Sequence, residues 1–92
     1  MSTLIAKPLT ALAKEIWFDK EHFYVRLMDG RELSVPLEWF PSLRKASDQQ
    51  RKRWRLIGGG VGIHWSALNE DISVSALLGA IAKQLEQVMF II

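Results

Sequence analysis

The sequence predicts a small α+β domain: an antiparallel meander or mixed sheet, two or three short helices and a C-terminal amphipathic helix. Residues 15–35 are rich in β-branched and aromatic side chains between turn signals. Residues 37–54 combine a helix-capping pattern with short apolar spacings, and apolar residues recur at intervals of four and three from Val74 onward. The 92 residues, 49% of them apolar, suffice for one core, so we expect a single domain over 1–92.

After a first strand at 16–18, two strands are expected to form a hairpin with the three-residue loop 28–30. A two-residue loop would place apolar residues opposite polar ones across the pair. The three-residue loop pairs Val25 with Leu33, and it puts Gly30 in a left-handed position where a Cβ is unfavourable. The strand should end at Pro36, because proline has no N–H to donate to the ladder.

Two short helices are expected next. Apolar residues at 37, 40 and 43 indicate the first. Ser47 followed by Gln50 matches a capping box, which predicts a second helix over 48–54 with Trp54 as its buried anchor.

Two further strands are expected at 55–57 and 61–65, joined by the glycine run 58–60. The run lacks the Lys-Ser/Thr of a phosphate-binding loop, and Trp65 follows His64 where the sequence would need the third glycine of a dinucleotide fingerprint. We therefore interpret these glycines as structural, allowing a bulge or a close crossing beneath a tryptophan.

The last segment predicts a helix capped by Asp71 or Ser73. Its apolar positions follow the heptad spacing of a seam: Val74, Leu78, Ile81, Leu85, Val88 and Ile92. The seam spans fewer than three heptads, so we expect it to pack against its own domain or against a dimer mate. Residues 80–92 are the candidate oligomerisation segment, with Leu78, Ile81 and Leu85 as candidate interaction residues.

Composition excludes several chemistries. The chain has no cysteine, which removes disulfides, thiolate nucleophiles and cysteine zinc sites and fits a reducing compartment. We see neither a signal peptide nor a membrane span, so we expect a cytoplasmic protein. His64 with Glu70 and Asp71 could form a metal site or an acid–base pair, but the spacing supports neither. We expect a structural histidine, no catalytic, cofactor or metal-binding residue, and no enzymatic activity.

Six of the twelve basic residues lie between positions 44 and 55, where only Asp48 is acidic. They are Arg44, Lys45, Arg51, Lys52, Arg53 and Arg55. Such a cluster is either a solvated basic face or a surface for phosphates, which makes nucleic-acid binding the alternative function. Four tryptophans are expected in the core, although Trp65 is also a candidate for an interaction surface.

Two long runs carry a family resemblance. They are IWFDKEHFYVRLMDGRELSVPLEWFPSLRKAS and RWRLIGGGVGIHWSALNEDISVSALL, within residues 14–79. They resemble the bacterial family known as domain of unknown function 2442. The sequence departs from that pattern at 66–69 and after Gly79.

The resemblance implies a small α+β domain for which no catalytic residue is established. It also implies an interaction module, because members are found alone, fused to helix-turn-helix domains, or beside a second small protein in toxin–antitoxin-like pairs. We therefore expect a non-enzymatic interaction or regulatory module, such as the antitoxin-like partner of a second small protein. The apolar seam of the last helix leads us to expect that it also forms a homodimer.

Overall fold

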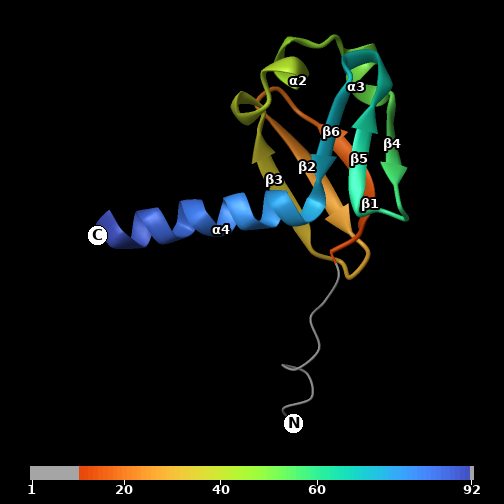
Figure 1. The fold of residues 1–92 in the computed structure, drawn as a ribbon. Coiled ribbons are helices and arrows are strands. Elements are labelled where there is room, and N and C mark those ends of the chain that lie inside the picture. Colours follow the sequence, from red (N-terminus) through yellow and green to blue (C-terminus); the bar gives the residue numbers. More distant parts are fainter. Residues whose placement is uncertain (1–10, 92) are drawn as a thin grey trace.

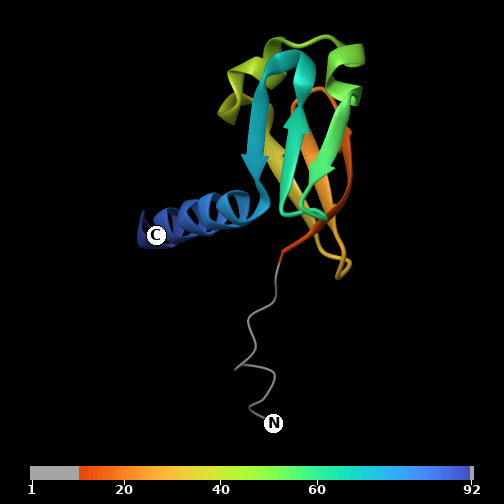
Figure 2. The ribbon, with the colours of Figure 1, turned by 45° about the vertical axis from the view of Figure 1, so that its right-hand side comes forward.

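The computed structural model describes residues 11–91, with side chains described up to residue 82. Two three-stranded antiparallel sheets enclose a common core (Figures 1 and 2). The first sheet contains β1 (Ala13–Phe18), β2 (His22–Leu27) and β3 (Glu32–Pro36), and the second contains β4 (Trp54–Ile57), β5 (Gly62–Trp65) and β6 (Glu70–Ser73). The helices are α2 (Pro41–Lys45), α3 (Asp48–Lys52) and α4 (Val74–Ile91), with 3-10 turns η1 (Leu37–Trp39) and η2 (Ser66–Leu68). The α+β class is confirmed.

The β2–β3 hairpin has the predicted three-residue loop. Val25 lies opposite Leu33 in the ladder, and the N–H of Leu27 donates to the carbonyl of Arg31 at 2.8 Å. Gly30 has a φ of 95°, in the left-handed region that disfavours a Cβ. The strand ends at Pro36, as predicted.

Trp65 lies at the centre of the core between the two sheets. It is fully buried, and its ring makes edge-to-face contacts with Phe18 and Phe23 at centroid distances of 6.3 and 6.1 Å. Such pairs add to the stabilisation that burial itself provides. The sheets are therefore joined by a single aromatic cluster with contributions from β1, β2 and β5.

Gly60 brings the β4–β5 turn against β1. Its carbonyl accepts a hydrogen bond from the N–H of Ala13 at 2.8 Å, and a Cβ built on Gly60 would lie 2.5 Å from the Ala13 carbonyl oxygen. The predicted close crossing is confirmed. It is made against the β1 backbone, however, and not beneath a tryptophan.

Three local predictions are corrected. The apolar segment 37–43 forms η1 and α2 in place of one helix, since Pro41 begins a new helix at its first position. The capping box of α3 is present, but the helix ends at Lys52 and Trp54 is a half-buried strand residue paired with Trp65. Residues 70–73 form β6, a strand that the sequence analysis missed.

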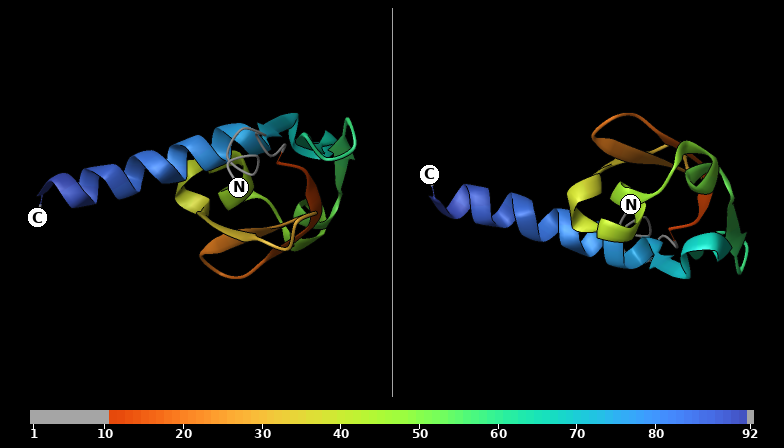
Figure 3. Two further views of the ribbon diagram at one scale, coloured as in Figure 1. Left: turned by 90° about the horizontal axis from the view of Figure 1, so that it is seen from below. Right: turned by 90° about the horizontal axis from the view of Figure 1, so that it is seen from above.

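Helix α4 begins directly after β6. Ser73 caps it, as one of the two predicted candidates, by accepting a hydrogen bond from the N–H of Ala76 at 3.3 Å. Figures 1 and 3 show the helix leaving the β-sheets after its first turns and continuing away from them. In the part of the chain that the structure describes, no helix is long and apolar enough to cross a membrane.

Candidate interaction surfaces

The structure divides the predicted basic cluster between several elements. Five of its six members are exposed: Arg44 and Lys45 on α2, Lys52 on α3, Arg53 after α3, and Arg55 on β4. The sixth, Arg51, has a side chain only 14% exposed. We call the five exposed residues the basic surface.

Arg51 joins elements of the chain to one another. Its guanidinium donates to the carbonyl oxygens of Leu43 (Nε, 2.9 Å) and Arg44 (Nη2, 2.8 Å), at the end of α2. The same group lies over the ring of Phe18, 5.7 Å from its centroid. The Leu43 carbonyl also accepts from the N–H of Ala46, whereas the Arg44 carbonyl belongs to the last turn of α2, where helix carbonyls lack a partner within the helix. Arg51 is therefore a structural residue and not a member of the basic surface.

Trp65 is excluded from any interaction surface. It is fully buried, and its indole N–H donates to the carbonyl of Arg51 at 3.0 Å. The prediction that it belongs to an exposed surface is therefore wrong, whereas the expectation of a core tryptophan is confirmed. Trp17, in contrast, is not part of the core that we expected for it. Its ring stacks on that of Tyr24 on the outer face of the first sheet, with 5.5 Å between the ring centroids.

The histidine cluster considered from the sequence is split by the sheet. His64 Nδ1 hydrogen-bonds to Asp71, which lies opposite it in the β5–β6 ladder. Glu70 points elsewhere and accepts a hydrogen bond from Ser42. Among the described residues, no group of three or more His, Cys, Asp or Glu residues could hold a metal ion. The geometry fits the structural histidine that we expected.

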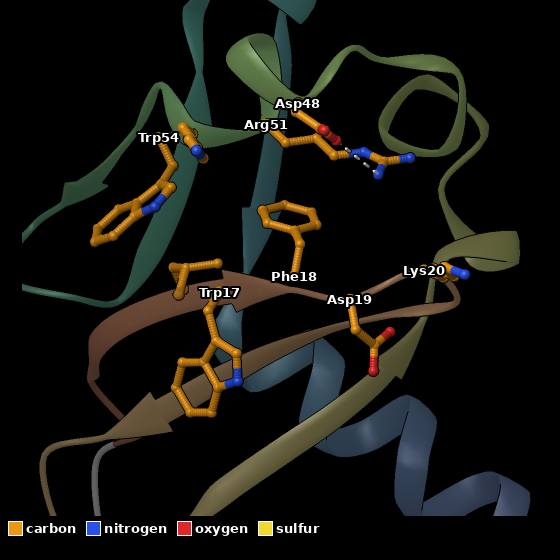
Figure 4. Close-up of a pocket in the computed structure, with 9 residues that line it drawn as sticks. Trp17, Phe18, Asp19, Lys20, Asp48, Arg51 and Trp54 are labelled. Carbon is orange, nitrogen blue, oxygen red and sulfur yellow. Dashed lines mark ion pairs between the residues drawn. The ribbon is translucent and has the colours of Figure 1, made fainter.

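A cleft of 560 Å³ opens between β1 and the α3–β4 segment (Figure 4). Its walls come from two stretches of chain far apart in sequence: Ile16, Trp17, Phe18, Asp19 and Lys20 on one side, and Asp48, Arg51, Lys52 and Trp54 on the other. Figure 4 shows Phe18 pointing toward Arg51, while Trp17 points away on the other side of β1. The cleft thus has an aromatic floor and a charged rim, and its volume is in the usual range for ligand sites.

One of the acidic groups at the rim is already bound within the chain. Asp19 accepts hydrogen bonds from the Tyr24 hydroxyl and from the N–H groups of Glu21 (2.9 Å) and His22 (2.7 Å). The Tyr24 hydrogen bond, followed by the two backbone donors, lowers the pKa of Asp19 below its ordinary value. The same contact raises the pKa of Tyr24. Asp19 is therefore an anion whose oxygens face its own turn.

Among the side chains that the structure describes, the predicted seam of α4 lies against the core. Val74 and Leu77 are buried in the core, although Leu77 lies outside the predicted seam. Leu78 and Ile81 are half-buried against the core. The side chains of Leu85 and Val88, and Ile92 as a whole, lie outside the described residues.

The sequence analysis did not identify the cleft. Trp17 and Trp54 were assigned to the core or to a helix, and Lys20 lies far from the basic cluster in sequence. The available signal was the aromatic run at 16–18 beside Lys20, but only the fold brings that run to α3.

Comparison with known proteins identifies relatives without a known function. A crystal structure of a protein of unknown function from Rhodospirillum rubrum is 28% identical, with a TM-score of 0.66 over 76% of this chain and 87% of the other. The solution structure of an uncharacterized protein from Chromobacterium violaceum is 20% identical, with a TM-score of 0.64 over 74% of this chain and 64% of the other, which shows a similar fold. No curated protein matches the chain.

The family model described as "Protein of unknown function (DUF2442)" matches residues 13–83. This confirms the resemblance and extends it beyond Gly79, farther along α4. Since the match covers most of the sequence, the chain belongs to the DUF2442 family.

Proposed function

We propose that the chain is a non-enzymatic protein-interaction module that forms a homodimer through α4. The observation that carries this proposal is the course of α4, which continues beyond the β-sheets after its first turns (Figure 1). The heptad-spaced residues Leu85 and Val88 fall on this projecting part of the helix. An apolar seam on a helix is stabilised when a second helix covers it.

A second copy is the occupant that this seam fits best. Two copies present identical apolar spacings, so two-fold association satisfies both seams at once. The polar side chains brought together elsewhere in the described structure, such as His64 with Asp71, connect neighbouring strands. These pairs support a structural role for the polar residues that form them.

Light scattering after size exclusion tests the homodimer. The full chain is expected to have twice the mass of one chain at micromolar concentration. Leu85→Glu should weaken dimerisation roughly 100-fold, because a carboxylate buried without a partner costs a few kcal/mol. Gln87→Glu introduces the same side chain off the seam and should leave the dimer intact.

A monomeric wild-type chain would refute the homodimer. If that monomer instead formed a complex with a co-expressed second small protein, the antitoxin-like assembly that the family resemblance implies would replace it. Equal effects of the two glutamate variants would also refute a seam-mediated contact. Far-ultraviolet circular dichroism of each variant separates loss of association from loss of folding.

Nucleic-acid binding is the second candidate function, favoured by the exposure of the basic surface. Contacts between these side chains and phosphates would release counterions, so retention in a gel-shift assay should fall steeply with salt. Replacing Lys52 and Arg53 with alanine should abolish that retention while leaving α4-mediated association intact. Absence of any shift at low salt would remove this candidate.

A further inference from the structure

We propose that the cleft between β1 and β4 binds an extended peptide segment of a second protein, which adds a strand to the outer edge of β1 and places an acidic side chain at the rim. This surface is separate from α4. The proposal therefore goes beyond the homodimer, and a chain that remained monomeric would still bind the segment.

The register of β1 directs part of its backbone into the cleft. The N–H of Asp19 donates to the carbonyl of His22 at 3.0 Å, so this residue faces β2. Backbone N–H and C=O groups alternate sides along a strand. Those of Trp17 therefore also point toward β2, whereas those of Ile16 and Phe18 point away from it. The N–H of Ala13, which reaches the carbonyl of Gly60, identifies that outer side as the one facing the β4–β5 turn.

The register of β4 gives a second outer edge. The N–H of Val74 donates to the carbonyl of Val61 at 3.0 Å, so the backbone groups of Val61 point toward the β6 side. Those of the other odd-numbered residues, Ile63 and Trp65, therefore also point toward β6. The backbone N–H and C=O of His64 therefore point toward β4, where His64 pairs with Arg55. By the same alternation, Trp54 and Leu56 direct their N–H and C=O groups away from β5.

The two outer edges lie in neighbouring sheets that share no ladder. They are joined where Ala13 contacts Gly60, and the cleft begins farther along β1, at Ile16 and Phe18, opposite Trp54. A row of alternating amide donors and acceptors is complementary to the main chain of an extended peptide, and it gives affinity in strand-addition complexes. Nucleic acids lack that alternating array.

The charges at the rim indicate the chemistry of the segment. Asp19 accepts hydrogen bonds from Tyr24 and from the backbone of its own turn. Asp48 Oδ1 lies 3.9 Å from Arg51 Nη1. Lys20 and Lys52 are exposed, and neither has an ion-pair partner among the side chains that the structure describes. A segment with an Asp or Glu beside an apolar residue would match the lysines and the aromatic floor.

Selection of peptides on the full-length protein tests the proposal. The probe is a displayed library of random decapeptides. We expect enrichment of sequences rich in β-branched residues that carry an Asp or Glu. The best synthetic peptide should slow hydrogen exchange of the Ile16 and Phe18 amides, and methylating its alternate backbone nitrogens should weaken binding by about tenfold or more.

Matched variants locate the acidic contact. Lys52→Glu should weaken the best peptide about tenfold, whereas Lys45→Glu, the same change on α2, should leave its affinity within about twofold. The proposal is overturned if no peptide is enriched, if the methylated peptide binds equally well, or if the two lysine variants behave alike. Binding of oligothymidylate alone would assign the cleft to single-stranded nucleic acid. Protection of both amides in the free protein, rising with its concentration, would assign the cleft to a second copy; either result also overturns the proposal.

Discussion

The indole N–H of Trp65 on β5 donates a hydrogen bond to the backbone carbonyl of Arg51 on α3, with 3.0 Å between nitrogen and oxygen. Arg51 in turn donates through its guanidinium to two carbonyls at the end of α2. The central core residue is thus connected to both short helices through one residue. These two side chains therefore connect the α2–α3 segment to the core.

Trp65→Phe should lower the free energy of unfolding by about 2–3 kcal/mol. The change leaves a cavity in the core and removes the donor for the Arg51 carbonyl. Trp54→Phe, at a half-buried position, should cost less than about 1 kcal/mol. Urea unfolding followed by circular dichroism measures both, and equal losses would contradict the central position of Trp65.

Arg51→Gln should destabilise the protein by about 1–3 kcal/mol, because a glutamine cannot supply both hydrogen bonds to α2. Arg53→Gln removes a neighbouring positive charge that is exposed, and it should change stability by less than about 0.5 kcal/mol. Thermal unfolding of the two variants at one pH compares them. Similar midpoints would show that Arg51 acts only through its charge.

Gly60→Ala should cost about 3 kcal/mol or more, because its Cβ would meet the Ala13 backbone and its φ of 116° is strained for other residues. Gly59→Ala is the control, since Gly59 has a φ of 72° and open space around it. The control should lose about 1–2 kcal/mol, the cost of left-handed backbone. If both variants unfold at the same urea concentration, the contact with β1 contributes nothing.

The Asp19–Tyr24 hydrogen bond predicts effects at both ends of the pH scale. The folded pKa of Asp19 is lowered, so its stabilisation is present above the unfolded pKa and is lost as the pH falls through the folded pKa. The folded pKa of Tyr24 is raised, so its stabilisation is present below the unfolded pKa and is lost as the pH rises through the folded pKa.

Tyr24→Phe should therefore shift the pKa of Asp19 upward, as followed by carboxyl carbon chemical shifts in an NMR titration. The variant should also lose the alkaline stability change assigned to Tyr24. His22→Gln is a control that leaves the phenol in place. An unchanged Asp19 pKa in Tyr24→Phe would show that the phenol does not contribute to the shift.

Local patterns predicted the parts of the fold that local chemistry determines. Pairing parity along β2 and β3 was enough to place Val25 opposite Leu33, and the capping box of Ser47 and Gln50 was enough to begin α3. The strand at 70–73 was missed because a short acidic segment before an apolar helix also matches a helix start. Its strand conformation depends on pairing with β5, which no local pattern reports.

The candidate sites were harder to predict because they depend on distant contacts. Six basic residues looked equivalent in the sequence, yet only the approach of α3 to α2 turns Arg51 inward. The cleft joins residues 16–20 to residues 48–54. Nothing in either stretch predicts that it lies beside the other. The sequence alone could therefore identify the aromatic and basic residues, but it could not show that they line one cleft.

The register shift between Ala13 and Glu15 has a consequence for the whole edge of β1. One extra residue, Lys14, lets two positions separated by an odd number of residues, Ala13 and Ile16, point the same way. The backbone of Ala13 is thereby bound to Gly60, whereas Ile16 lines the cleft. Removing Lys14 would reverse the direction of the backbone groups at one of these two positions. The length of this strand, more than the identity of any side chain in it, therefore decides whether one edge of β1 can contact Gly60 and also line the cleft.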